Sequence, residues 1–203
     1  LFLAAGALIH EAGTRDMDLL SGAGVKMPVT GGLFFVGAMG LTGIPMTGGF
    51  FSKDMIFAGA LSQKAYVPLA FAVVGAALTF TYTWRAYIRV FRGGPSKALS
   101  QAHEAPLSMT LPMGILGAGS IASWLLIGLE TGTMRETLPA LDIDEITPLE
   151  LLKETFTSPA FLLSAVALTA GLTLVVKRER VFGWLEKNAS TIMRAAQNGF
   201  YFD

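Results

Sequence analysis

The sequence predicts an all-α, polytopic transmembrane helix bundle with one discontinuous helix and a C-terminal amphipathic surface helix. Of the 203 residues, 52% are hydrophobic and only 15% are charged, whereas soluble domains carry roughly 25% charged residues. The charges are also unevenly distributed and leave long uncharged runs. An apolar run of about 20 residues is long enough to cross a hydrocarbon core of roughly 30 Å.

The uncharged runs give the positions of the helices. No Lys, Arg, Asp or Glu occurs between Lys26 and Lys53, Lys64 and Arg85, Glu104 and Glu130, or Glu154 and Lys177. We predict spanning helices at about 28–63, 66–88, 106–128 and 158–176. The first residues, 1–9, predict a fifth, truncated helix, so we expect the chain to begin inside a span. A soluble all-helical protein with apolar core helices is the weaker alternative, because these runs have spanning length.

The cations predict the orientation in the membrane. Eleven lie in the segments that follow the first, third and fifth helices: Arg15, Lys26, Arg85, Arg89, Arg92, Lys97, Lys177, Arg178, Arg180, Lys187 and Arg194. The opposite face holds three: Lys64, Arg135 and Lys153. By the positive-inside rule the first group is cytoplasmic. We expect a multi-pass protein of a bacterial or archaeal inner membrane.

Composition also excludes several kinds of site. The chain has no cysteine, which removes disulfides, thiolate metal sites and cysteine nucleophiles. Its formal net charge is zero, so it lacks the basic footprint of a nucleic-acid-binding protein. The two histidines, His10 and His103, have no metal-ligand spacing, and we find no nucleotide-binding fingerprint. We therefore expect neither a metal nor a cofactor on this chain, and no nucleic-acid partner.

The run 28–63 is too long to be one straight spanning helix. Its 36 residues would extend about 54 Å at 1.5 Å per residue. Pro45 removes a backbone donor, and Gly43, Gly48 and Gly49 tolerate unusual dihedral angles. We predict half-helices at about 29–42 and 50–63, joined by an extended stretch. Broken helices at membrane depth often mark ion or proton sites, although a plain proline kink is the alternative.

Charged residues follow this predicted break directly. Lys53 and Asp54 are the only charged residues in the 28–63 run, and charges at this depth are costly and often functional. We predict that they form a proton relay, and that at least one of them faces a neighbouring helix. The alternative is that Lys53 extends to the membrane surface or forms a structural ion pair. His10 is a candidate proton-entry group, or an interfacial histidine without such a role.

The chain is predicted to have two parts. Residues 1–176 form the bundle, and 177–203 form a cytoplasmic amphipathic segment with apolar residues at helical spacing. Between the last two spans, residues 129–157 carry the acidic run Asp142–Glu145, which we interpret as part of a solvated loop.

Several stretches resemble one known family. They are LFLAAGALIH (1–10), GIPMTGGFFSKD (43–54), YTWRAYIRVFRG (82–93), HEAPLSMTLPMGILGAGSI (103–121) and NGFYFD (198–203). Together they resemble the C-terminal part of the L subunit of respiratory complex I (NADH:quinone oxidoreductase), one of its antiporter-like subunits. The resemblance implies that Lys53 and Asp54 belong to the exit half of a hydrated proton path. It also implies that further path residues precede Leu1 and that a lateral helix follows residue 203.

The resemblance implies a function that depends on other chains. It predicts a proton-translocating subunit coupled to quinone reduction, with flavin, iron–sulfur clusters and quinone on partner subunits of the membrane arm and beyond. In that case the enzyme label, a translocase, belongs to the assembly. The alternatives are a subunit of a multisubunit cation/proton antiporter, of a membrane-bound hydrogenase or of a deazaflavin dehydrogenase, and a structural membrane scaffold.

Overall fold

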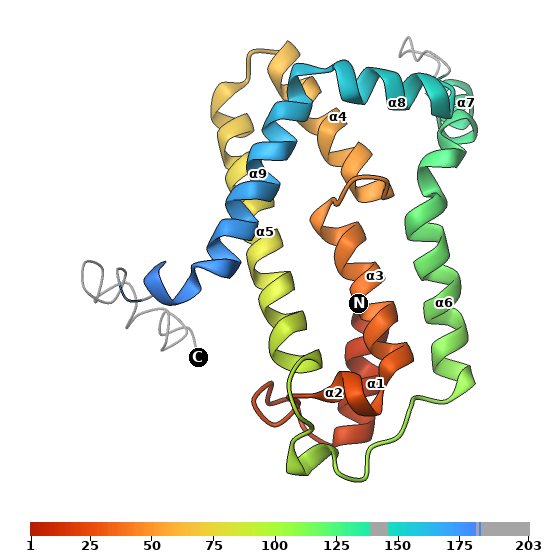
Figure 1. The fold of residues 1–203 in the computed structure, drawn as a ribbon. Coiled ribbons are helices and arrows are strands. Elements are labelled where there is room, and N and C mark those ends of the chain that lie inside the picture. Colours follow the sequence, from red (N-terminus) through yellow and green to blue (C-terminus); the bar gives the residue numbers. More distant parts are fainter. Residues whose placement is uncertain (139–145, 182, 184–203) are drawn as a thin grey trace.

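The computed structural model describes residues 1–138, 146–181 and 183. Over these residues the chain consists of α-helices and short 3₁₀ segments, without a strand. Figure 1 shows long helices running between two ends of the molecule, with α3 and α4 stacked end to end at the centre. The predicted all-α polytopic bundle is confirmed.

The helix bounds agree with the uncharged runs. The helices are α1 (Phe2–Ala12), α2 (Ala23–Lys26), α3 (Pro28–Thr42), α4 (Gly48–Ser62), α5 (Tyr66–Phe91), α6 (Leu107–Ala122), α7 (Ile127–Thr137), α8 (Pro148–Thr157) and α9 (Pro159–Val176), with 3₁₀ turns η1 (Lys97–Leu99) and η2 (Ser123–Leu126). Within the described residues, three helical segments are long and apolar enough to cross a membrane: Tyr66–Phe91, Leu107–Thr137 and Pro159–Val176. The central helices α3 and α4 have 15 residues each, so each spans only part of a bilayer.

The described residues of the segment 129–157 are largely helical, whereas we predicted a loop. The span that begins at Leu107 continues through η2 and α7 to Thr137, and α8 lies across the upper end of the bundle (Figure 1). A capping box starts α8: the Thr147 hydroxyl accepts from the Glu150 amide at 3.3 Å, and the Glu150 carboxylate accepts from the Thr147 amide at 2.9 Å. The loop prediction was therefore wrong for these stretches, while the run 142–145 lies outside the described residues.

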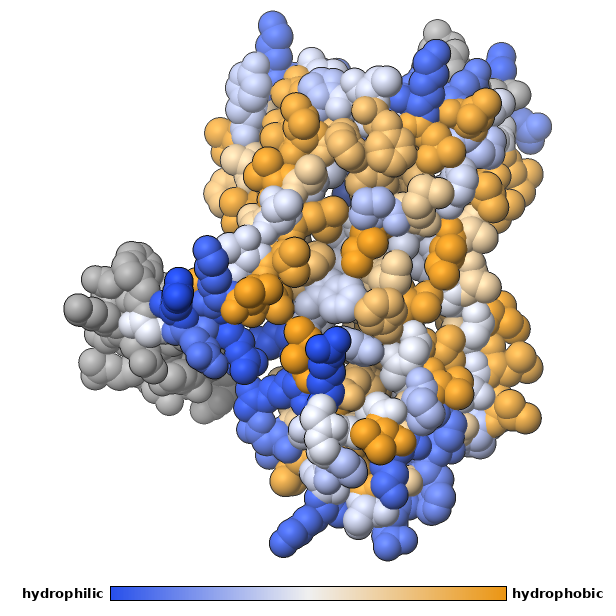
Figure 2. All heavy atoms as spheres, viewed as in Figure 1, coloured by the Kyte–Doolittle hydropathy of each residue, from blue (hydrophilic) through white to orange (hydrophobic). Residues whose placement is uncertain are grey.

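Two long helices, α5 and α9, pack along one side of the bundle. They are in close contact at Gly171, where an added Cβ would lie 2.6 Å from Phe80 Cβ and 2.9 Å from the carbonyl oxygen of Ala77. Small residues at such a crossing let two membrane helices come together. Apolar side chains cover much of the outer surface (Figure 2), as expected for a chain surrounded by lipid or by other membrane helices.

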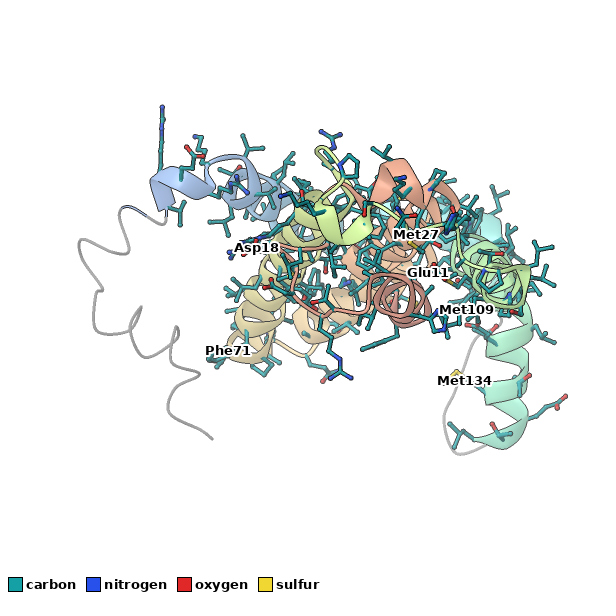
Figure 3. The ribbon with its side chains drawn as sticks, turned by 90° about the horizontal axis from the view of Figure 1, so that it is seen from below. Glu11, Asp18, Met27, Phe71, Met109 and Met134 are labelled. Carbon is teal, nitrogen blue, oxygen red and sulfur yellow. The ribbon has the colours of Figure 1, made fainter. Side chains whose placement is uncertain are left out.

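The connections at the lower end of Figure 1 pack against one another. The amide of Gly22 donates to Arg92 O at 3.2 Å, and the ammonium of Lys26 donates to Ser100 O at 3.1 Å. Arg89 forms a salt bridge with Asp18. Figure 3 views the molecule from this end: Glu11 and Met27 are labelled close together, Asp18 lies farther toward the end of α9, and Met134 of α7 lies on the opposite side. We call it the cation-rich end, because it carries the described members of the larger cation group.

One carboxylate holds this end to the central helix. Glu104 accepts from the amides of Val29 (2.7 Å) and Thr30 (3.2 Å), from the Thr30 hydroxyl (2.6 Å) and from the Ala105 amide (3.0 Å). The first amides of a helix have no partner within the helix, and a carboxylate there also interacts well with the helix dipole. Desolvation raises the pKa of Glu104, but the hydrogen bonds outweigh it and hold the pKa below its usual value.

The predicted C-terminal segment lies largely outside the described residues. Residues 178–181 are helical, directly after α9. Residues 182 and 184–203 are not described, so the amphipathic helix and the division at residue 176 remain predictions.

Candidate functional site

The central helix is interrupted where the sequence predicted. Helix α3 ends at Thr42, and Gly43 adopts a left-handed conformation (φ 73°). Residues 43–47 form the connection, which contains Pro45, and α4 begins at Gly48. The two half-helices match the predicted ranges 29–42 and 50–63 to within two residues at each end.

Two of the predicted break glycines play a different part from the one we expected. Gly48 and Gly49 belong to the first turn of α4 rather than to the extended connection. A Cβ at Gly49 would lie 1.8 Å from the carbonyl oxygen of Gly40, and a Cβ at Gly48 would lie 1.9 Å from Ser123 Oγ. These glycines therefore allow close packing of α4 against α3 and η2, and only Gly43 is needed for its positive φ.

Lys53 reaches back from α4 to the end of α3. Its half-buried side chain donates a hydrogen bond from Nζ to the carbonyl oxygen of Leu41. The last carbonyls of a helix lack helical partners, and the negative end of the helix dipole favours a cation there. The ammonium thus occupies the break itself instead of extending to the membrane surface. The left-handed Gly43 leaves room for it, since a Cβ there would lie 3.1 Å from Lys53 Cδ.

Asp54 faces a different neighbour. Its side chain is buried, with 2% of the residue exposed, and its Oδ1 accepts a hydrogen bond from Ser164 Oγ of α9 at 3.0 Å. Ser164 is itself only 5% exposed. A buried carboxyl group needs such a partner, because burying an unpaired polar group is costly.

Lys53 and Ser164, the hydrogen-bond partner of Asp54, line one small cavity, whereas Asp54 itself does not. Lys53, Thr42 and Ser164 line a space of about 10 Å³ at the break, together with apolar side chains of α4, α5 and α9. That volume is at the lower limit for a single water molecule. Lys53 and Asp54 form no salt bridge with each other; adjacent residues of a helix do not face the same side.

Aromatic side chains surround the break. Phe50 and Phe51 are buried and pack edge to face on each other, and Phe51 also contacts Trp124. On the α5 side, Trp84 Nε1 donates to Thr42 Oγ1 at 3.3 Å. These contacts fix the ends of both half-helices and keep the cavity small.

The other predicted site residue lies elsewhere. His10 is exposed near the end of α1, with Nδ1 3.5 Å from the Glu11 carboxylate, and it does not line the cavity at Lys53. Nor do the described ranges contain a group of three or more His, Cys, Asp or Glu residues that could hold a metal ion.

Two contributors to the arrangement were not identified from the sequence. Ser164 is 110 residues from Asp54, and a small polar residue inside the apolar run 159–176 was the one signal that pointed to it, since such residues face other helices. Glu104, which holds the far end of α3, stands just before a predicted span and was not singled out.

Comparisons with known proteins give one family match and several relatives. Residues 1–79 match the family described as NADH:quinone oxidoreductase/Mrp antiporter, transmembrane. Over 168 residues the chain is 34% identical to F(420)H(2) dehydrogenase subunit L of Methanosarcina mazei, covering 78% of this chain and 22% of that protein.

Two further relatives are named for different functions. The A subunit of the Na(+)/H(+) antiporter of Bacillus subtilis is 36% identical over 135 residues, covering 60% of this chain and 17% of the relative. NADH-quinone oxidoreductase subunit L of Rickettsia bellii is 35% identical over 129 residues, covering 62% and 20%. The aligned region is thus about a fifth of the length of each of these proteins.

Proposed function

We propose that this chain, whose residues 1–79 match the NADH:quinone oxidoreductase/Mrp antiporter transmembrane family, carries protons through a Lys53/Asp54 relay in a membrane complex. The observation that carries the proposal is the position of Lys53. Its ammonium is bound at the interruption of a membrane helix, on a main-chain carbonyl that a helix would otherwise leave without a partner.

The relay needs a lysine that can both hold and release a proton. In its present position the ammonium is favoured by the Leu41 carbonyl and by the end of the α3 dipole. A shift of α4 relative to α3 would break that hydrogen bond and favour release, since burial disfavours a lysine's charged form. Moving one charge against 100 mV costs about 2.3 kcal/mol, which equals less than two pKa units at 1.36 kcal/mol each. A small rearrangement at the break is therefore sufficient for each step.

Asp54 and Ser164 are proposed to form the next position of the path. The carboxyl group is on the following residue of α4, but it faces α9. A single water molecule in the cavity lined by Lys53 and Ser164 would connect the ammonium with the Ser164 hydroxyl, which already bonds Asp54. The aromatic side chains around the break would keep bulk water out while the proton moves.

The coupling reaction belongs to the assembly. We propose a NADH:quinone oxidoreductase-type complex in which partner subunits of the membrane arm and beyond carry the flavin, iron–sulfur clusters and quinone. The relative named subunit L of a NADH-quinone oxidoreductase supports this choice. We also propose that the cation-rich end faces the cytoplasm, on the cation distribution, and that His10, exposed at that end, is where a proton enters.

The second candidate is a cation/proton antiporter component. Two relatives favour it, one named for the A subunit of a Na(+)/H(+) antiporter and one for the A/B subunit of a probable K(+)/H(+) antiporter. Such an assembly needs no electron donor. Sodium- or potassium-dependent proton exchange by the reconstituted assembly without any donor would support it over the redox-coupled complex.

The test uses the full-length chain in its native assembly, reconstituted in proteoliposomes. Proton uptake is followed with a pH-sensitive dye for Lys53→Ala and for the control Lys153→Ala, which removes an exposed cation of α8. We expect uptake to fall by at least tenfold in Lys53→Ala and to remain normal in Lys153→Ala, with equal assembly in both. Wild-type uptake in a fully assembled Lys53→Ala complex would refute the relay, and a scaffold role would then explain the chain.

A further inference from the structure

A groove opens between α5 and α9 below their contact at Gly171. The two helices touch at Gly171, and beyond that point the end of α9 turns away from α5 (Figure 1). The resulting cleft measures about 510 Å³. Its walls toward the middle of the helices are mainly apolar and include Leu78, Tyr82, Leu174 and Val175. The groove is independent of the site at Lys53, whose cavity has no lining residue in common with it.

The other end of the groove is strongly basic. Arg85, Arg89 and Arg178 line it, and the same three arginines also line an adjoining cleft of about 620 Å³ that includes Arg92. Residues 85, 89 and 92 are four and three positions apart, so they share one face of α5. Figure 2 shows hydrophilic residues gathered at the lower end of α9, directly below hydrophobic ones.

Among the described residues that line the two clefts, positive charge exceeds negative charge. The one acid in these linings is Glu179, and Arg89 is also paired with Asp18. Among the described residues, Arg92 and Arg178 have no side-chain hydrogen bond or salt bridge. Guanidinium groups are well suited to phosphate, because their planar fork can donate two parallel hydrogen bonds.

The length of α5 is compatible with arginines at the depth of lipid phosphates. Helix α5 has 26 residues, about 39 Å at 1.5 Å per residue, which exceeds a hydrocarbon core of roughly 30 Å. With the start of the hydrocarbon core taken at Tyr66, about 20 residues of α5 cross it, which ends at about residue 85. On this count Arg85 is at the boundary, and Arg89 and Arg92 are in the headgroup region.

We propose that this groove binds an anionic phospholipid. An acyl chain lies in the apolar cleft between α5 and α9, and the headgroup phosphate lies among Arg85, Arg92 and Arg178. Basic pockets between membrane helices recognise anionic headgroups in this way. Because the apolar cleft adjoins the arginines, we expect a lipid to bind in preference to free phosphate. Because positive charge exceeds negative charge there, we expect a headgroup with net negative charge to bind in preference to a zwitterionic one.

The experiment measures lipid selectivity of the full-length chain in its native assembly. Complexes are placed in nanodiscs of phosphatidylcholine with a small fraction of spin-labelled phosphatidylglycerol or spin-labelled phosphatidylcholine, and the immobilised fraction of each label gives relative affinities. The double variant Arg92→Gln/Arg178→Gln is compared with wild type. The matched control is Lys64→Gln/Lys97→Gln, which removes two exposed cations that do not line the groove.

We expect the preference for phosphatidylglycerol to fall about fivefold for each arginine removed, so roughly twenty-five-fold in the double variant, and to stay near wild type in the control. Ala86→Trp fills the cleft without changing charge, and it should also reduce immobilisation of the anionic lipid.

Three results would overturn the proposal. The first is equal preference for both lipids in wild type, and the second is an equal loss in the control variant, which would indicate general attraction. The third is full displacement of labelled phosphatidylglycerol by millimolar inorganic phosphate, which would identify a free anion as the ligand.

Discussion

Removing the Glu104 carboxylate should loosen the first turn of α3 without affecting other helices. Glu104 is the hydrogen-bond acceptor for the amides of Val29 and Thr30, which have no partner inside the helix. A hydrogen bond to a charged group contributes about 1.5–3 kcal/mol, and partial exposure of the carboxylate reduces that value. We therefore expect Glu104→Ala to lower the free energy of opening the first turn of α3 by about 1.5–2 kcal/mol.

The assay is amide hydrogen exchange of the full-length protein at pH 7, followed by mass spectrometry of peptides that contain Val29 and Thr30. Since about 1.4 kcal/mol corresponds to a factor of ten, exchange should become about tenfold to thirtyfold faster in Glu104→Ala. Glu136→Ala removes an exposed carboxylate of α7 and should leave these peptides unchanged. Equal exchange in wild type and Glu104→Ala would show that the first turn does not depend on this carboxylate.

The same residue predicts a pH dependence. The pKa of Glu104 is lower in the folded protein than its ordinary value of 4.5. Its stabilising contribution is therefore complete above pH 4.5 and is lost as the pH falls through the lower, folded pKa. Glu104→Gln, which cannot ionise, should melt below wild type at pH 7, and the difference should shrink below pH 4.5. A difference in melting temperature that stays constant down to pH 3 would contradict the assignment.

Three further substitutions test other contacts. Gly49→Ala places a Cβ against α3 and should lower the yield of assembled complex severalfold. The control Gly59→Ala, where the added Cβ meets open space, should assemble normally. Equal yields of the two variants would refute the close-packing role of Gly49. Ser164→Ala removes the hydrogen bond to the buried carboxyl group of Asp54 and should slow proton uptake about tenfold. Ser164→Thr keeps a hydroxyl group and should retain most of the uptake. Normal uptake in Ser164→Ala would show that this residue is not part of the path. Thr147→Ala should destabilise α8 by about 1 kcal/mol, seen as faster amide exchange there with unchanged transport, and unaltered exchange would argue against the cap.

Much of the architecture could be predicted from the positions of the uncharged runs and of particular proline and glycine residues. The uncharged runs predicted the long helices, because a spanning helix needs about 20 apolar residues. Pro45 and Gly43 predicted the break within a few residues, because Pro45 cannot donate a backbone hydrogen bond and Gly43 adopts a positive φ. These are local properties, and a single sequence displays them.

Contacts between distant segments were not predictable in the same way. The pairing of Asp54 with Ser164 depends on how α4 packs against α9, which no local pattern encodes. Gly49 was interpreted as a flexible position, whereas its role is to let α3 approach, and that role is visible only once the helices are placed. The helix α8 was predictable from the sequence, because Thr147 and Glu150 have the spacing of a capping box. We predicted a loop instead because the segment is rich in acidic residues.

The most direct test of the central claim, that Lys53 at the helix break carries the transported proton, is the number of protons moved per electron pair by the reconstituted complex. We predict a lower ratio in Lys53→Ala than in wild type, at matched electron-transfer rates, and an unchanged ratio in Lys153→Ala. A fully assembled Lys53→Ala complex that moves the wild-type number of protons per electron pair would contradict the account.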